Sequence, residues 1–412
     1  MLYLKFQSIA NKIFSMQNRT EQFLNDPVFP LLIRMSAPNT IAFFIQAIVV
    51  LAEVWFISKL GTTSLAAVAL AFPVIMLTQQ MAFGALGGAV TSSIARSLGA
   101  EDKERAEKLL WHSLLLSCCG YLLFFLIFFI GGESLLMALG GEGSLLEESL
   151  LYIKIFLTGA IFIWLSGTLS AALRGIGNMR FPALLMILGS GIQVILAGGL
   201  ILGWFGFPKL GIIGAPLSAI SVAALMAIVM IFKFMHSSSN VQLKISNLSF
   251  EKELFRDIFN VALPASLAPI FTVGTILILT GLVGQFGVSA LAGYGIGSRI
   301  EFLMIPLVFG IGTAMTTMVG TNIGANKVER AERIGWLGGS FAGLFSGMIG
   351  LILILSSSYW INFFATDQAT YIVTKQYIEI VGLCFTFQGL GLSLYFASQG
   401  ANAMKWPIIA TV

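Results

Sequence analysis

The chain has 412 residues, of which 57% are hydrophobic and only 10% are charged, and its formal net charge is +4. Soluble domains carry about 25% charged residues because their surfaces face water. The composition therefore excludes an ordinary soluble protein and indicates an all-α polytopic membrane protein, whose small positive charge requires no nucleic-acid partner.

Apolar runs of about 20 residues, the length of a helix that crosses a bilayer, follow one another along the chain. The polar stretch before the first run, with Lys5, Lys12 and Arg19, lacks the apolar core of a signal peptide, so we expect the mature protein to keep the first span. Two spans are longer than a straight crossing needs and should tilt, bend or extend beyond the membrane. In chain order the predicted spans are 35–58, 62–95, 109–132, 149–171, 182–205, 211–235, 258–284, 288–320, 334–357 and 371–397, and an eleventh begins near Pro407.

Most of the 23 Lys and Arg residues lie in the N-terminal segment and in alternate loops. Cytoplasmic loops retain such residues, so we expect a multi-pass protein of the plasma membrane, the inner membrane in a bacterium, with a cytoplasmic N-terminus. Cys118, Cys119 and Cys384 fall inside predicted spans and indicate no disulfide or metal framework. No nucleophile motif or metal-ligand spacing accompanies His112 and His236, so we expect neither enzyme activity nor a cofactor.

A polar segment occurs twice. "SLGAEDKERAEK" (97–108) is nearly repeated by "NIGANKVERAER" (322–333), 225 positions later, and "RGIGNMRFP" (174–182) matches "QGANAMKWP" (399–407) at the same shift. Upstream the shift is 226, where Pro38 matches Pro264. This repeat predicts two homologous six-helix bundles related by a pseudo-two-fold axis along the membrane normal. In the two copies we expect Gly99 and Gly324 to occupy a left-handed turn at a helix end.

The repeat also sets the predicted domain boundaries. We expect a cytoplasmic N-terminal segment over 1–34, an N-terminal lobe of six helices over 35–237, a cytoplasmic linker over 238–257 and a C-terminal lobe over 258–412. The C-terminal lobe contains four predicted helices and the start of a fifth. We therefore expect its last one to two helices to be missing, either because the sequence is a fragment or because the bundle is naturally truncated.

Glu53 is an ionisable residue inside the first predicted span, with no cation beside it before Lys59. Burying a lone carboxylate is costly enough to favour proton uptake or cation binding, and an acid within a membrane span is a functional candidate. Asn39, Gln46 and Glu53 recur every seven residues, so they share one helix face. The alternative is that water and Lys59 solvate Glu53 near the outer interface. The second copy has Leu279 at this position, which indicates that coupling chemistry belongs to the first lobe.

Three segments carry a family resemblance: "PNTIAFFIQAIVVLAEVWFISKLGTTSLAAVAL", "RGIGNMRFP" and "ALAGYGIGSRIEFLMIPLVFGIGTAMTTMVGTNIGA". Together they resemble the multidrug and toxic compound extrusion (MATE) transporters. The resemblance implies twelve helices in two lobes, a cavity between them, and export of organic, often cationic, compounds by antiport with protons or sodium ions. This chain departs from the family by ending about two helices early. The expected partners are small-molecule drugs and the lipid bilayer, and the expected state is a monomer.

The resemblance also places an acid fifteen positions after a proline in the first helix, which here are Glu53 and Pro38. Pro38 is near the predicted start of that helix, where a proline can occupy the first turn without breaking anything. The resemblance nonetheless implies that bending of this helix accompanies protonation of the acid. Pro38 is therefore the predicted helix-bending residue.

In the fifth helix this chain has Gln193 and Ala197, where many relatives have Asn and Asp, and Ser218 in the sixth helix offers a hydroxyl. Because a sodium site would have fewer charged oxygen ligands, it would be weaker. We therefore predict that Glu53, Gln46, Gln193 and Ser218 couple transport to protons. Sodium bound at Glu53 is the alternative, and no other metal site is expected.

The substrate cavity is predicted to include Asn39, Arg299, Glu301 and Gln388. Arg299 and Glu301 are too close in sequence to face each other on one helix, so each needs other partners. An ion network that joins helices is an equal alternative for this pair. Two other functions stay open. A lipid-linked oligosaccharide flippase of the same broad superfamily would need several cationic residues in its cavity, where only Arg299 qualifies, and a truncated remnant would not transport.

Overall fold

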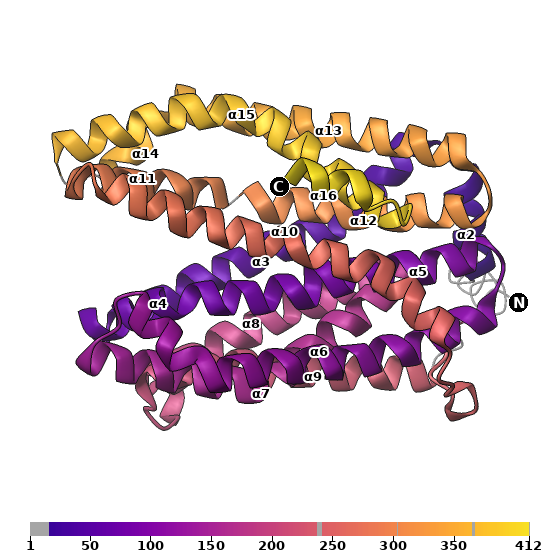
Figure 1. The fold of residues 1–412 in the computed structure, drawn as a ribbon, viewed down its shortest axis with the longest axis horizontal. Coiled ribbons are helices and arrows are strands. Elements are labelled where there is room, and N and C mark those ends of the chain that lie inside the picture. The colour runs from indigo at the N-terminus through magenta and orange to yellow at the C-terminus, as the bar shows by residue number, and fades with distance from the viewer. Residues whose placement is uncertain (1–15, 237–240, 303, 365–366, 412) are drawn as a thin grey trace, which may run out of the picture.

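The computed structural model describes residues 16–236, 241–302, 304–364 and 367–411, so that Lys5, Lys12 and part of the predicted linker lie outside the described residues. The described residues form helices and include no strand, which confirms the all-α prediction. Ten of their helical segments are long and apolar enough to cross a membrane. Figure 1 shows them in two groups, with α10 (Lys252–Gly284) running obliquely between the groups.

The first lobe follows a short helix, α2 (Met16–Asn25), and the second lobe begins with α10. The first lobe consists of α3 (Val28–Ser58), α4 (Thr62–Gln79), the π-helix η1 (Gln80–Leu86), α5 (Gly87–Gly99), α6 (Lys103–Ala138), α7 (Gly143–Gly175), α8 (Arg180–Leu202) and α9 (Gly214–His236). The second lobe continues with α11 (Val288–Phe302), α12 (Met304–Gly324), α13 (Val328–Leu355), α14 (Ser357–Phe364), α15 (Gln368–Gly400) and α16 (Lys405–Thr411).

The first span begins earlier than its hydropathy suggests. α3 starts at Val28, and Pro38 lies inside the helix. The prediction that Pro38 occupies a first turn is therefore wrong. A proline in a helix interior has no N–H to donate to the carbonyl four residues earlier, and it bends or weakens the helix there. The residue predicted to bend α3 thus lies where it can do so.

The longest span of the first lobe, Thr62–Gly99, is not one regular α-helix. In the first lobe the interruption is η1, a π-helical segment between α4 and α5, and such segments commonly bend a helix. Pro73 precedes η1 inside α4. In the second lobe the matching span comprises α11 and α12, which lie on either side of residue 303, outside the described residues.

Hydrogen bonds repeat between the lobes at the predicted shift of 225. Thr91 Oγ1 donates to the Ala171 carbonyl over 3.0 Å, which joins α5 to α7. The equivalent Thr316 Oγ1 donates to the Phe396 carbonyl over 2.9 Å, which joins α12 to α15. The two lobes are therefore copies of one packing arrangement, in agreement with the predicted pseudo-two-fold fold.

The glycines of the repeated segment have a role other than the predicted one. The left-handed residues are Glu101 (φ 61°) and its equivalent Asn326 (φ 57°), two positions after Gly99 and Gly324. The prediction that these glycines take the left-handed conformation is therefore wrong. They lie where the ends of α5 and α12 approach each other. A Cβ on Gly99 would collide with the Thr321 carbonyl oxygen, and a Cβ on Gly324 would collide with the carbonyl oxygen of Arg96.

The lobes meet at this end of the molecule, which we call the basic end because Arg96, Arg105, Lys327 and Arg330 lie there. One buried cluster combines the start of α3 with α12, and another combines the start of α10 with α5 and α6. The first helix of each lobe therefore packs against the other lobe. Away from the basic end, α4 packs on α7 and α11 packs on α15, each within its own lobe.

Candidate functional site

Three helices of the first lobe bring the predicted coupling residues together around Glu53. Gln193 Nε2 of α8 donates to Glu53 Oε1 of α3 over 2.9 Å. Ser218 Oγ of α9 lies 3.4 Å from the same oxygen. Gln46, two helical turns before Glu53, donates from Nε2 to Gln193 Oε1 over 3.5 Å. The four residues thus form one continuous polar cluster.

The hydrogen bonds of this cluster run in one direction. Ser190 Oγ donates to Gln46 Oε1 over 3.0 Å, Gln46 donates to Gln193, and Gln193 donates to Glu53. Ser190, Gln193 and Ser218 are buried, whereas Gln46 and Glu53 are partly exposed. An ionised carboxylate only accepts hydrogen bonds. A chain of donors that ends on Glu53 therefore stabilises the charged form of this residue, which the apolar surroundings oppose.

Ser218 can serve Glu53 in both protonation states. Its Oγ lies 2.8 Å from the Ala215 carbonyl oxygen, which can only accept. A serine hydroxyl has one hydrogen and two lone pairs. If the hydrogen points to Ala215, the oxygen of Ser218 can accept a hydrogen bond from a protonated Glu53. If it points to Glu53, it stabilises the carboxylate.

The sequence did not indicate two further members of the site. Ser190 precedes Gln193 by three residues on α8, so helical spacing could have revealed it. Tyr152 of α7 is buried and close enough to interact electrostatically with Glu53. No local pattern marks Tyr152, because its position depends on how α7 packs against α4 and α9.

Lys59 is not the counter-ion of Glu53. Its Nζ lies 5.0 Å from the centroid of the Trp55 ring, and in the described part of the chain it forms no ion pair with Glu53. Trp55 also packs against Phe56 and Trp204, whose own ring centroids are 5.3 Å apart. Aromatic rings and not an opposite charge therefore lie at this end of α3.

Asn39 lies about 21 Å along α3 from Glu53, at the usual rise per residue. Its side chain is 2% exposed, and Nδ2 donates to Thr313 Oγ1 of α12 and to Met179 Sδ, each over 3.3 Å. The three residues predicted to share one face of this helix therefore contact different neighbours. Gln46 and Glu53 bind α8 and α9, whereas Asn39 joins the two lobes near the basic end.

A second polar cluster lies in the second lobe, between α11 and α15. Gln388 Nε2 donates to Glu301 Oε1 over 2.9 Å, and the Tyr377 hydroxyl donates to Glu301 Oε2 over 2.7 Å. The Tyr294 ring packs edge to face on Tyr377, with centroids 5.6 Å apart. Arg299 is exposed and has no hydrogen bond or ion pair among the described residues. The acid and the amide predicted for the cavity thus meet, and the guanidinium does not join them.

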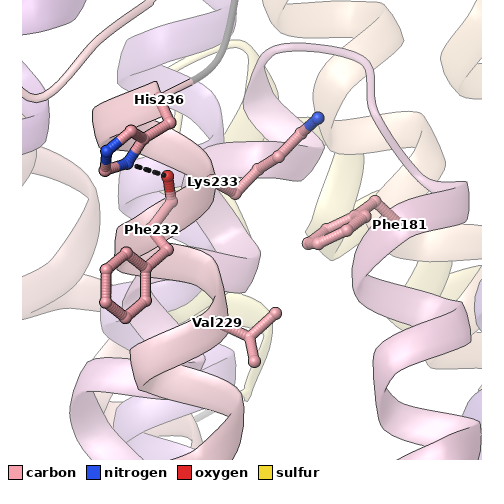
Figure 2. A pocket seen from close by; sticks show the side chains of 5 residues that line it. All are labelled: Phe181, Val229, Phe232, Lys233 and His236. Carbon is pink, nitrogen blue, oxygen red and sulfur yellow. Dashed lines mark hydrogen bonds between the residues drawn. The ribbon is translucent and has the colours of Figure 1, made fainter.

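Figure 2 shows a shallow groove between α8 and α9 at the basic end. Lys233 extends toward Phe181, with its Nζ 5.5 Å from the ring centroid. His236 Nδ1 lies 3.3 Å from the Phe232 carbonyl oxygen. Val229 completes the lining. None of the predicted coupling or cavity residues lines this groove, so it is separate from the candidate site.

The described residues contain ten apolar helices long enough to span a membrane, arranged in two repeats. In the first repeat, residues of three helices surround the carboxylate of Glu53. These features define a polytopic membrane transporter. The model of the MatE family matches residues 38–198 and 264–412, one segment in each lobe. The chain belongs to the MatE family, whose members are transporters and not enzymes.

Individual relatives are similar over most of the chain. The FAD transporter of Shewanella oneidensis is 26% identical over 399 residues, which cover 94% of this chain and 85% of that protein. The probable multidrug resistance protein NorM of Thermotoga maritima is 26% identical over 387 residues, which cover 92% and 82%. A solved structure of a multidrug resistance MATE family transporter in its outward-facing conformation matches with a TM-score of 0.85 at 26% identity, over 95% of this chain and 86% of that one.

Proposed function

We propose that this protein is a secondary active exporter that exchanges organic compounds, often cationic, for protons. The carrying observation is the Glu53 cluster, in which one carboxylate receives donors from α8 and α9 while Leu279 stands at the equivalent place in the second lobe. Its relatives include proteins named for multidrug resistance and for FAD transport, so organic solutes are the common class. The basic end would face the cytoplasm of a plasma membrane.

The proposed cycle uses two states of Glu53. The ionised carboxylate accepts hydrogen bonds from Gln193 and Ser218 and so holds α3 against α8 and α9. A protonated Glu53 donates to Ser218 and attracts the Gln193 amide less strongly. Because Pro38 weakens α3, loosening the Gln193 contact allows this helix to bend. Such a bend changes the first-lobe surface that faces the substrate and lowers substrate affinity when a proton binds.

Alternating access would exchange contacts between the two ends of the lobes. In this structure the inter-lobe contacts are concentrated at the basic end, where α5 meets α12. The likeness to an outward-facing relative agrees with this arrangement. We infer that the structure represents the state closed to the cytoplasm.

The donor set at Glu53 favours a proton over sodium. Sodium requires several oxygen ligands, as hard cations do. Gln193 presents its Nε2 to Glu53, and its oxygen is occupied by Gln46. Ala197, at the position of a second acid in many relatives, is buried and supplies no oxygen. Sodium at Glu53 stays the alternative coupling ion.

Export of a fluorescent organic cation from cells or vesicles that contain the 412-residue chain tests this function. We expect an inward proton gradient to drive export in sodium-free medium and an equal sodium gradient to fail. Export driven by sodium alone would assign the site to sodium. Export under neither gradient would identify a non-transporting remnant. Transport of a lipid-linked oligosaccharide in place of the cation would favour a flippase.

The serine that contacts Glu53 should set the pH dependence of transport. We expect Ser218→Ala to shift the midpoint of the pH–transport profile, because the variant loses the hydroxyl that can hydrogen-bond to Glu53 in either protonation state. Ser221→Ala, one turn away on the same helix at an exposed position, should leave the profile unchanged. Identical profiles for the two variants would exclude Ser218 from the coupling site.

The cluster around Glu301 suits an organic cation, because a carboxylate lies beside the rings of Tyr377 and Tyr294. We expect Glu301→Gln to raise the KM for a cationic substrate about tenfold, the loss of one charge-assisted contact, while the pH profile stays unchanged. Glu379→Gln, an exposed acid on α15, is the matched control. An unaltered KM with Glu301→Gln would favour a purely structural role for this cluster.

A further inference from the structure

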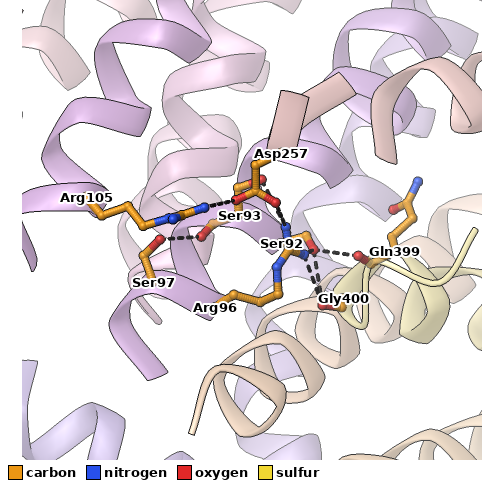
Figure 3. A network of polar contacts seen from close by, with 8 residues as sticks. All are labelled: Ser92, Ser93, Arg96, Ser97, Arg105, Asp257, Gln399 and Gly400. Atoms are coloured by element: carbon orange, nitrogen blue, oxygen red, sulfur yellow. Dashed lines mark hydrogen bonds and ion pairs between the residues drawn. The ribbon is translucent and has the colours of Figure 1, made fainter. Parts of the chain in front are cut away.

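An acid of the second lobe is held by two arginines of the first lobe at the basic end (Figure 3). Arg96 Nη2 of α5 lies 2.6 Å from Asp257 Oδ1 of α10, and Arg105 Nη2 of α6 lies 3.0 Å from Asp257 Oδ2. The side chains of Arg96 and Asp257 are each 13% exposed, and that of Arg105 is 40% exposed. Both carboxylate oxygens are therefore used in ion pairs that cross from one lobe to the other.

Arg96 makes a second contact between the lobes. Its Nη1 lies 3.4 Å from the Gly400 carbonyl oxygen at the end of α15, and it also contacts Ser92. Ser92 Oγ lies 2.5 Å from the Gln399 carbonyl oxygen and 3.1 Å from that of Gly400. One turn of α5 therefore binds two separate helices of the second lobe, α10 through a charge and α15 through its terminal carbonyls.

The equivalent loop of the second lobe binds the first lobe, but through neutral acceptors. Arg330, the equivalent of Arg105, donates from Nε to the Phe23 carbonyl over 3.2 Å and also contacts the Asp26 carbonyl. Asn322 Nδ2 donates to the Phe23 carbonyl over 3.1 Å, and Lys327 Nζ donates to the Leu24 carbonyl over 3.2 Å. Each lobe thus binds the segment that precedes or begins the first helix of the other lobe.

The two halves of this contact differ in charge. At shifts of 225 and 226, Asp257 corresponds to Leu32 and Leu31, both buried. In the α10 half an acid therefore forms ion pairs with the arginines of the other lobe, whereas Arg330 hydrogen-bonds to backbone carbonyls. Removing one member of a largely buried ion pair is costly because the other charge is left unpaired away from water. Without Asp257, the Arg96 guanidinium would be unpaired and poorly hydrated in the closed state. Separation of the lobes would hydrate it, so the separated state would be favoured.

We propose that Asp257 is a positioning residue for transport: its ion pairs with Arg96 and Arg105 latch the lobes together at the basic end and open in each cycle. The proposal rests on the alternating access inferred above. The latch acts on the closed state. It places an ion-pair contact on α10 opposite a contact in which the acceptors are backbone carbonyls of residues 23–26. The closed state is therefore sensitive to the charge of Asp257.

The test measures the distance between spin labels at two exposed positions of the basic end, Glu104 on α6 and Val328 on α13, by double electron–electron resonance. The labels are placed in a variant without the three native cysteines. We expect Asp257→Asn to raise the ratio of separated to closed lobes about tenfold, a typical size for conformational coupling. Asp257→Glu keeps the charge and should restore much of the closed population.

Glu253→Gln removes an equal charge one turn earlier on α10, at an exposed position, and should leave the distance distribution unchanged. Arg105→Gln removes one of the two ion pairs at a half-exposed site and should raise the separated population by an intermediate amount. This variant keeps the proposal testable if Asp257→Asn does not fold. Equal distributions for the parent protein, Arg105→Gln and Asp257→Asn would overturn the latch. Absence of transport by the parent protein would instead contradict the proposed function, because the distance measurement does not depend on transport.

Discussion

Replacing Glu53 by glutamine should leave the protein folded and remove the response of export to the pH gradient. Glutamine can still accept from Gln193 and donate to Ser218, so the local packing is kept, but it cannot release or bind a proton. Coupling between linked sites is typically worth a factor of about 5 to 150 in affinity. We therefore expect gradient-driven export of an organic cation to fall by at least about tenfold.

Two controls accompany this prediction. Glu133→Gln makes the same change at an exposed position of α6 and should transport normally. Glu53→Asp keeps a titratable group with a shorter reach, so export should be reduced but still respond to pH. If Glu53→Gln exports at the normal rate with a normal pH dependence, another residue carries the coupling ion.

Replacing Gly324 by alanine should destabilise the contact between the lobes. A Cβ at this position meets the carbonyl of Arg96, which belongs to a helix backbone and cannot rotate away. Overpacking of this kind costs about 1–3 kcal/mol, whereas replacing glycine by alanine inside a helix ordinarily gains about 0.5–1 kcal/mol. The net effect should be a lower thermal unfolding midpoint in detergent and a larger separated population in the distance measurement.

The pseudo-two-fold arrangement supplies a second variant and a control. Gly99→Ala meets the Thr321 carbonyl in the equivalent contact and should behave like Gly324→Ala. Gly191→Ala, inside α8 with open space around it, should keep or raise the unfolding midpoint. A Gly324→Ala protein as stable and as closed as Gly191→Ala would contradict the close approach of α5 and α12.

Hydropathy predicted most of the fold because lipid imposes one rule on every span, a long apolar helix. The same rule explains what was missed. The first span begins at Val28 within the segment expected to precede it, and the short helices α2 and α14 were not predicted, since neither reaches the length that a span requires. The repeat predicted the symmetry but not that Gly99 and Gly324 serve helix packing.

The candidate site was predictable where its members share a helix or a family position. Gln46 and Glu53 follow from seven-residue spacing, and Gln193 and Ser218 follow from the resemblance. Tyr152 was missed because its proximity is a property of packing between helices. Asn39 illustrates the limit of periodicity, which identifies a helix face but not the neighbour that the face meets at each depth.

Asp257 illustrates the same limit. It lies near the expected end of a linker, where an acid is ordinarily solvated, and only the approach of α5 and α6 to α10 surrounds it with two arginines. The shift of 225 does match Arg105 with Arg330 in the two copies of the loop. It could not reveal that Arg105 binds a carboxylate whereas Arg330 binds backbone carbonyls.

Proton movement measured in sodium-free proteoliposomes tests the central claim most directly. An outward gradient of an organic cation, imposed across vesicles that contain the protein, should drive protons inward as the cation leaves, and a pH-sensitive dye inside should report acidification. We expect this signal for the parent protein and for Glu133→Gln, and its absence for Glu53→Gln. Cation movement without acidification, or equal acidification with Glu53→Gln, would contradict proton exchange at Glu53.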